Sequence, residues 1–167
     1  VNWSETTAEA GYLTISIAHT PRTDFEREQL CLSIGINDMN ACALFKQLNW
    51  DRPYDISAVI NELERINRQG DLSGQIDIER IAVGGHSAGA GGTLSVAGAL
   101  RKFTATPVSL ADQRPIAFLA FSPQQPGTEG FFDTDFKQSL HSWRPIGERP
   151  VLIGTGDGDN ACKPIEA

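Results

Sequence analysis

Two features that would assign a functional class at once are missing from this sequence. No apolar run is long enough to span a bilayer, so we expect no transmembrane segment. An excess of basic residues is also missing, because 14 Lys and Arg residues stand against 21 Asp and Glu residues, a formal net charge of −7. An acidic chain is a poor match for the phosphate backbone of nucleic acids, so we expect no nucleic-acid partner.

Cysteine is scarce, and its spacing predicts no metal site. Cys31, Cys42 and Cys162 include no Cys-x-x-Cys pair, so they give no zinc signal and leave open whether any disulfide forms. The run 157–160 begins like a calcium loop, but the series of oxygen ligands stops at Ala161 and no bidentate glutamate follows at the required place. We therefore expect chemistry that needs no metal.

Glycine is plentiful, but no glycine cluster has the spacing of a nucleotide-binding loop. In the clusters at 84–92 and 154–158, Leu94 and Asp159 stand where a Gly-x-Gly-x-x-Gly pattern needs its third glycine. The Gly-Lys-Ser or Gly-Lys-Thr of a phosphate-binding loop does not occur either. We expect no nucleotide cofactor.

Alternating strand and helix patterns predict an α/β fold. The clearest helix covers 53–69, where apolar residues recur from Ile56 at i, i+3, i+4, i+7 and i+10. Strands that alternate with helices give a mostly parallel sheet with helices on both faces. At 167 residues we expect a single domain over 1–167. The expected strands are 12–18, 81–83, 116–121 and 151–154; the other expected helices are 2–10, 37–48 and one from Ala90 onward, with 25–32 as a helix or part of an insertion.

The stretch 123–149 lies between the last two expected strands and is rich in Pro, Gly and aromatic residues. Loops of this length inside a compact domain are usually functional or carry short helices. We therefore expect a loop insertion with a functional role; the alternative is that the aromatic side chains only pack the loop down. These side chains are Phe131, Phe132, Phe136 and Trp143.

The chain is organised around the stretch 80–100, which has the pattern of a strand, a sharp turn and a helix of small residues. The turn contains Gly85-His86-Ser87-Ala88-Gly89, a Gly-x-Ser-x-Gly pattern in the context that a nucleophile elbow requires. We expect a strained backbone at Ser87, and glycine on either side because a side chain at Gly85 or Gly89 would collide with the neighbouring strand or helix. The backbone N–H of Ala88, at the start of the helix, would stabilise an oxyanion.

On these residues the chain resembles the α/β-hydrolase family. The resemblance is closest to the esterase branch that includes dienelactone hydrolases, cutinase-like polyesterases and platelet-activating-factor acetylhydrolases, and the segments 11–19, 52–56 and 149–159 are similar to that branch as well. It implies a partial α/β-hydrolase core, because the family's earlier strands and second oxyanion donor would lie upstream of Val1. It also implies a small-molecule ester as substrate, and neither metal nor cofactor. At 123–149 the resemblance implies a cap or loop insertion that shapes the substrate pocket.

The resemblance implies a catalytic acid and a base in the chain order Ser, Asp or Glu, His. Asp159 ends the turn after the last strand and is the preferred acid; Asp157 is the second choice, and the alternative is that both carboxylates only tighten the turn. The base is missing from its expected place, since none of His19, His86 and His141 follows Asp159.

We therefore predict a serine hydrolase that cleaves carboxylic esters through an acyl-enzyme on Ser87, with Asp159 orienting an imidazole and the Ala88 N–H in the oxyanion hole. Because no histidine follows the acid, we expect the 167-residue chain alone to be catalytically poor. The alternative is a non-catalytic α/β-hydrolase-like module that binds a ligand or partner. Such a module would keep the turn and lose the base, but it would need neither Ser87 nor Asp159.

Overall fold

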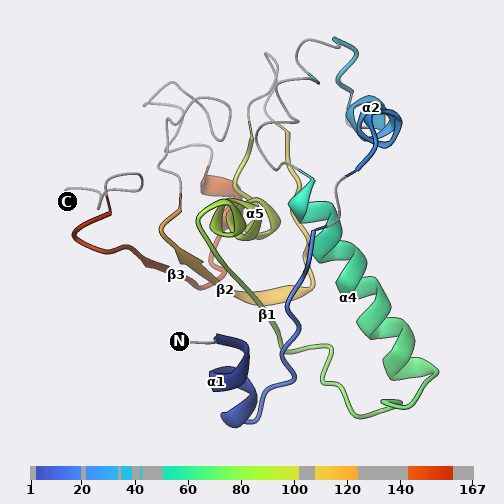
Figure 1. Ribbon diagram of the computed structural model, residues 1–167, viewed down its shortest axis with the longest axis vertical. Helices are drawn as coiled ribbons and strands as arrows, with labels where there is room; N and C mark the ends of the chain where they lie inside the picture. Colours follow the sequence, from blue (N-terminus) through green and yellow to red (C-terminus); the bar gives the residue numbers. More distant parts are fainter. Residues whose placement is uncertain are drawn as a thin grey trace.

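Three parallel strands form the centre of the protein in its computed structural model (Figure 1). They are β1 (Ile81–His86), β2 (Pro115–Phe121) and β3 (Val151–Gly154), hydrogen-bonded in the order β1-β2-β3. Helices pack on this sheet, so the expected α/β arrangement is confirmed at this level. The structure describes residues 3–19, 22–33, 35–38, 42, 51–101, 108–123 and 143–159.

The register of the sheet fixes which residues lie side by side at its carboxyl edge. β1 runs beyond the expected 81–83 and ends at His86, which pairs with Phe121 of β2. Phe121 pairs in turn with Gly154 of β3. The strands expected at 116–121 and 151–154 are confirmed, with β2 starting one residue earlier. All three strands therefore end at the same level, in one row of paired residues.

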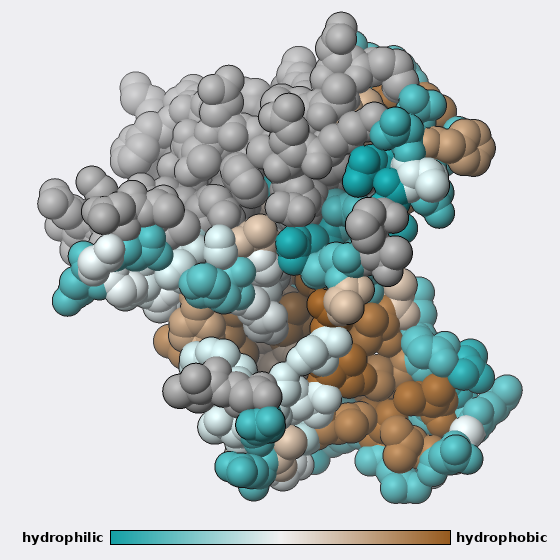
Figure 2. All heavy atoms as spheres, in the orientation of Figure 1, coloured by the Kyte–Doolittle hydropathy of each residue, from teal (hydrophilic) through white to brown (hydrophobic). Residues whose placement is uncertain are grey.

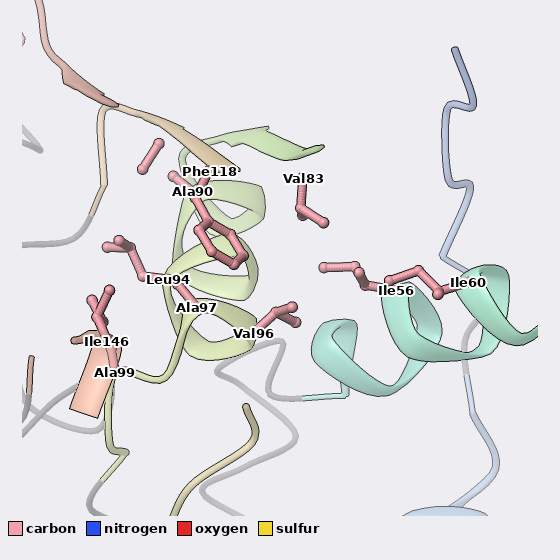
Figure 3. Close-up of a cluster of buried hydrophobic side chains, with 11 residues drawn as sticks. Ile56, Ile60, Val83, Ala90, Leu94, Val96, Ala97, Ala99, Phe118 and Ile146 are labelled. Atoms are coloured by element: carbon pink, nitrogen blue, oxygen red, sulfur yellow. The ribbon is translucent and has the colours of Figure 1, made fainter. Parts of the chain in front are cut away.

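The main core lies between the sheet, helix α5 (Ala88–Ala97) and helix α4 (Arg52–Arg68), as Figure 3 shows. α5 consists of small and aliphatic residues, and all of them from Ala90 onward are buried. Small residues allow a close approach of the two helices: a Cβ at Gly92 would lie 3.2 Å from the Cβ of Arg52. Truncating the fully buried Leu94 to alanine would cost about 2–5 kcal/mol. The cluster comprises Ile56, Ile60, Val83, Ala90, Leu94, Val96, Ala97, Ala99, Phe118, Ala120 and Ile146.

Helix α4 confirms the clearest helical pattern of the sequence. Pro53 lies at its start, where the missing N–H removes no helical hydrogen bond. Asp55 in the first turn and Arg68 in the last turn complement the helix dipole. The buried side chains Ile56 and Ile60 lie one turn apart on the face toward the core.

The strand expected at 12–18 is wrong: residues 12–19 have no regular structure. A strand needs a neighbour with which to share hydrogen bonds, and this segment pairs with none of the three strands of the described sheet. Its side chains bond instead to α1 (Trp3–Glu9), through Thr14 to Thr7 and Ser16 to Ser4, each at 2.6 Å. Figure 2 shows apolar surface in the region where this segment passes α4 in Figure 1.

Helix α1 confirms the helix expected at 2–10 and lies across the sheet from α5 (Figure 1). Its Trp3 ring stacks on Phe121, with 4.9 Å between the ring centroids. Phe121 alternates along β2 with Phe118 and Ala120, which face the core with α5, so Trp3 contacts the opposite face. Helices therefore lie on both faces of this small sheet.

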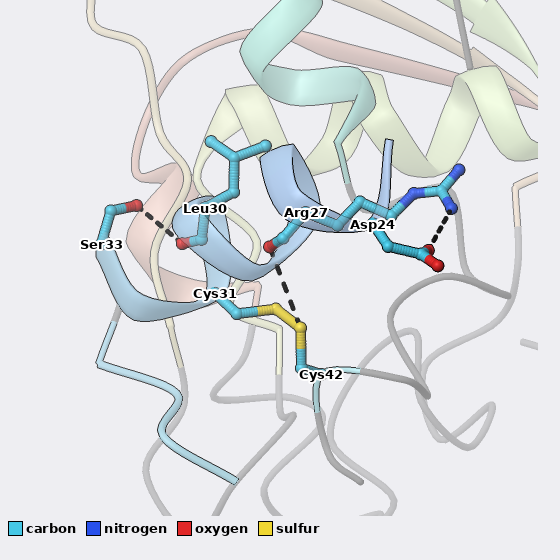
Figure 4. Close-up of a disulfide and its surroundings, with 6 residues drawn as sticks. All are labelled: Asp24, Arg27, Leu30, Cys31, Ser33 and Cys42. Carbon is cyan, nitrogen blue, oxygen red and sulfur yellow. Dashed lines mark hydrogen bonds and ion pairs between the residues drawn. A yellow bond between two sulfur atoms is a disulfide. The ribbon is translucent and has the colours of Figure 1, made fainter. Parts of the chain in front are cut away.

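Helix α2 (Asp24–Ser33) is attached by a disulfide between Cys31 and Cys42, which the cysteine spacing had left open (Figure 4). Both cysteines are buried and form a second small cluster with Ile36, against which Tyr54 of α4 packs. The bridge joins positions 11 apart, and closing a loop of this size stabilises a fold by about 3 kcal/mol in the chain-entropy account.

A buried carboxylate, Asp112, joins α4, α5 and β2 at the amino end of the strands. It accepts a hydrogen bond from Ser57 Oγ at 2.8 Å and from Arg114 Nε at 2.9 Å, and its own N–H donates to the Val96 carbonyl at 3.0 Å. Arg149, before β3, donates to the Asp112 carbonyl at 2.8 Å. The hydrogen bonds from Arg114 lower the pKa of Asp112 to about 2, so this carboxylate stays charged at neutral pH.

Two sequence predictions fall mainly outside the described residues. Of the helix expected at 37–48, only 37, 38 and Cys42 are described, and of the cap expected at 123–149, only 123 and 143–149 are described. The latter part contains a short 3-10 helix, η1 (Arg144–Ile146), whose Ile146 joins the main core. Within the described part of the chain, no helix is both long and apolar enough to cross a membrane.

Candidate active site

Ser87 occupies a sharp turn between β1 and α5, with φ 55° and ψ −119°. A positive φ is uncommon for a residue with a side chain, and such strain persists only where the surrounding structure imposes it. The Ser87 N–H donates to the Phe121 carbonyl at 2.9 Å, and the Ser87 carbonyl accepts from the Gly91 N–H at 3.1 Å. The strained serine is thus fixed from both sides, by the sheet and by the helix.

The two glycines of the motif have different reasons to be there. A Cβ at Gly85 would lie 2.4 Å from the carbonyl carbon and oxygen of Gly89, so the turn closes only because position 85 has no side chain. A Cβ at Gly89 would meet none of the described residues within 4 Å. The expected steric need for glycine is therefore confirmed before Ser87 and wrong after it, because α5 turns the second glycine toward open space.

The start of α5 presents backbone donors beside Ser87. The first intrahelical bond of this ten-residue helix runs from Gly91 to Ser87, so the N–H groups of Ala88, Gly89 and Ala90 have no acceptor within the helix. These donors lie at the positive end of the helix dipole. The Ala88 N–H follows the serine directly, where charge would develop on a bound carbonyl oxygen.

Each of the three strands is followed, at the carboxyl edge of the sheet, by a residue with a hydroxyl group. Because His86 pairs with Phe121 and Phe121 with Gly154, the next residues are Ser87, Ser122 and Thr155. The ladder extends into this row, since the Ser87 N–H bonds to Phe121 and the Ser122 N–H bonds to Gly154 at 2.7 Å. The turn that contains Asp159 follows Thr155, so the structure brings Ser87 and Asp159 to the same edge with one strand between them.

The spacing between these positions has room for a catalytic base. Neighbouring strands lie about 4.8 Å apart, so the backbones of Ser87 and Thr155 are separated by about 10 Å. An imidazole that bonds to a serine hydroxyl on one side and to a carboxylate on the other fills a gap of this kind. The site geometry is therefore compatible with a nucleophile over β1 and an acid over β3.

The two candidate acids differ in exposure. Asp159 is half-buried, and its N–H donates to the Gly156 carbonyl at 2.9 Å, which closes the turn. Asp157 at the tip of the turn is exposed. The preference for Asp159 over Asp157 as the acid stays a prediction.

Neither described histidine forms a side-chain hydrogen bond with Ser87. The Nδ1 atom of His19 lies 2.7 Å from a carboxylate oxygen of Asp55 at the start of α4, and Arg22 forms an ion pair with the same carboxylate. His86 is exposed at the end of β1. His141 lies outside the described residues. The structure therefore places two of the three histidines and makes neither of them a hydrogen-bond partner of Ser87.

A cavity of about 290 Å³ lies beside the His19–Asp55 pair, away from the elbow. Neither Ser87 nor Asp159 belongs to its lining. Sequence reasoning gave no indication of this pair or of the strained Ser122. The lining residues are Ile17, Ala18, Arg22, Glu26, Asp55, Ala58 and Val59.

A metal centre finds no support in the described geometry. Over residues 3–19, 22–33, 35–38, 42, 51–101, 108–123 and 143–159, no three His, Cys, Asp or Glu side chains gather as a metal ion would require. Among the described residues, the candidate site offers a serine hydroxyl, backbone donors and a carboxylate.

Comparison with known proteins assigns no family or function to the chain, so a functional assignment depends on the geometry described above. No protein-family model, no curated protein and no solved structure matches the chain. The established result is a small three-stranded parallel sheet with helices, in which a strained serine joins the first strand to the helix that follows it.

Proposed function

We propose that this chain contains the nucleophile of a serine hydrolase of the α/β-hydrolase type, which cleaves carboxylic esters through an acyl-enzyme. The observation that carries the proposal is the backbone of Ser87, at φ 55° and ψ −119° between a parallel strand and a helix. A strand-to-helix turn with a strained serine at its apex is the local structure that exposes such a nucleophile.

The chemistry follows from the arrangement at the carboxyl edge. Ser87 Oγ attacks the ester carbonyl as its proton passes to an imidazole held by Asp159. The tetrahedral oxyanion accepts a hydrogen bond from the Ala88 N–H. The imidazolium then gives its proton to the departing alkoxy oxygen, which leaves an acyl group on Ser87. Water hydrolyses this acyl-enzyme by the same route and releases the carboxylic acid.

The ester class comes from the resemblance of the elbow and the Asp159 turn to the esterase branch of that family. Ester cleavage needs a nucleophile, a base and an oxyanion donor, and it needs no metal. The elbow supplies the first and the third of these groups. His141 lies outside the described residues, and His19 is engaged by Asp55 at 2.7 Å, so the described residues supply no base.

A non-catalytic module is the second candidate, because no histidine in the described part of the chain contacts Ser87. Hydrolysis of p-nitrophenyl butyrate separates the two, with the protein carrying its natural ends. The esterase proposal expects turnover that Ser87→Ala abolishes and that Ser109→Ala, a change at an exposed loop serine, leaves intact. Absence of turnover, with the ester still bound, would favour the binding module.

A further inference from the structure

Ser122 repeats the backbone geometry of Ser87 one strand further along the sheet. Both residues directly follow a parallel strand, and both have positive φ, 55° for Ser87 and 48° for Ser122. They are the two non-glycine residues with positive φ in the described part of the chain. Each donates its N–H to the last residue of the next strand, Ser87 to Phe121 and Ser122 to Gly154.

No interaction of the Ser122 hydroxyl within the described fold explains why position 122 is a serine. Its backbone N–H bonds to Gly154, but in the described part of the chain its Oγ atom has no hydrogen-bond partner. Glycine would adopt the same φ without strain. A strained, half-buried residue with a free hydroxyl at the edge of a candidate site indicates a role in that site.

The register places Ser122 in the gap between the nucleophile and the acid. Ser122 follows Phe121 as Ser87 follows His86, so the two serines lie side by side. Their backbones are about 4.8 Å apart by the usual strand spacing. The base that connects Ser87 with Asp159 must occupy the space above this row, and it protonates the leaving oxygen there. The leaving alkoxy group therefore departs on the side of Ser122, away from the donors at the start of α5.

We propose that the Ser122 hydroxyl donates a hydrogen bond to the leaving alkoxy oxygen of the ester, which makes Ser122 a catalytic residue of the acylation step. This inference rests on the proposed esterase function. As the bond between carbonyl carbon and alkoxy oxygen breaks, the electron pair moves onto that oxygen. The hydroxyl stabilises this charge until the base delivers its proton, and Ser122 itself neither gains nor loses a proton.

Two esters with the same acyl group test the inference. Ethyl butyrate releases a poor leaving group that needs stabilisation, whereas p-nitrophenyl butyrate releases a phenolate that spreads its own charge. In the protein with its natural ends, we expect Ser122→Ala to lower kcat/KM for ethyl butyrate about tenfold or more, the usual value of a hydrogen bond to a charged group. For p-nitrophenyl butyrate we expect kcat/KM to change by less than about twofold. The nitrophenyl ring takes up much of the negative charge, so little of it stays on the leaving oxygen.

Two variants and one label separate a chemical role from a structural one. Ser122→Gly relieves the positive φ and should show the same selective loss without loss of stability, whereas Ser109→Ala should change neither ester. Equal effects on both esters, or none, would overturn the role of Ser122. A fluorophosphonate label on Ser87 in the same samples shows whether the nucleophile is active: label without selectivity contradicts only the Ser122 role, and no label on Ser87 contradicts the esterase function as well.

Discussion

The backbone N–H of Ser87 donates a hydrogen bond to the carbonyl oxygen of Phe121 at 2.9 Å. Phe121 ends the central strand, and a Cβ added at Gly154 would lie 3.0 Å from its ring. The same residue therefore contacts the Ser87 turn through its backbone, and its side chain lies beside Gly154 at the end of β3. The geometry of the candidate site depends on the sheet as much as on the start of α5.

Replacing Gly85 by alanine should disrupt the elbow. The new Cβ would overlap the backbone of Gly89 at 2.4 Å, and backbone atoms cannot move aside as a flexible side chain does. We expect a loss of at least about 3 kcal/mol in the free energy of unfolding, measured by urea denaturation. Gly89→Ala is the matched control: its Cβ meets none of the described residues within 4 Å, and alanine favours a helix, so stability should stay or rise. Equal losses in both variants would contradict the role of position 85.

Stability should fall in acid through Asp112. Its pKa is lowered from 3.8 to about 2, chiefly by the hydrogen bonds from Arg114, so the folded state favours the charged carboxylate. A lowered pKa gives stability that is complete above the unfolded value and is lost as the pH falls through the folded one. Between pH 5 and pH 2 we expect a loss of about 2 kcal/mol from this group. Urea denaturation of Asp112→Asn should show a lower stability at pH 7 and a flatter decline; an unchanged acid slope would contradict this.

The Cys31–Cys42 bridge should stabilise the attachment of α2. Replacing both cysteines by serine removes a closed loop with a sequence separation of 11. We expect a loss of about 3 kcal/mol in unfolding free energy, and the same loss in the parent protein after reduction with dithiothreitol. Because reduction cannot affect the double serine variant, that variant serves as the control. Stability that does not respond to dithiothreitol would show that the bridge is absent.

His19 should not be the catalytic base. Its Nδ1 lies 2.7 Å from Asp55, and no contact joins it to Ser87. His19→Asn keeps a donor toward Asp55, so we expect p-nitrophenyl butyrate hydrolysis within about threefold of the parent, far from the 10²–10⁴-fold effect of losing a general base. A loss as large as that of Ser87→Ala would show that His19 moves into contact with the nucleophile during turnover.

The sequence predicts local elements well where one segment alone decides the structure. The apolar spacing from Ile56 predicts α4, and the Gly-x-Ser-x-Gly pattern predicts the strand, turn and helix around Ser87. The segment 12–18 has a strand pattern but no partner strand in the described sheet, and hydrogen-bond pairing is not encoded in the segment itself.

Contacts between distant residues could not be predicted for the same reason. The pairing of Cys31 with Cys42 and the contact of His19 with Asp55 depend on how α2 and α4 meet. The strain at Ser122 depends on the register of β2 with β3, which no local pattern shows. Open space beside Gly89 likewise follows from the direction of α5, since the motif alone suggests the same need for glycine on both sides of Ser87.

Covalent labelling is the most direct test of Ser87 as the nucleophile. The protein with its natural ends is treated with a fluorophosphonate, and the modified residue is located by mass spectrometry of its peptides. We predict an adduct on Ser87, which is lost in Ser87→Ala and kept in Ser109→Ala. An adduct on another serine, with Ser87→Ala labelled as fully as the parent, would contradict the assignment of Ser87 as the nucleophile.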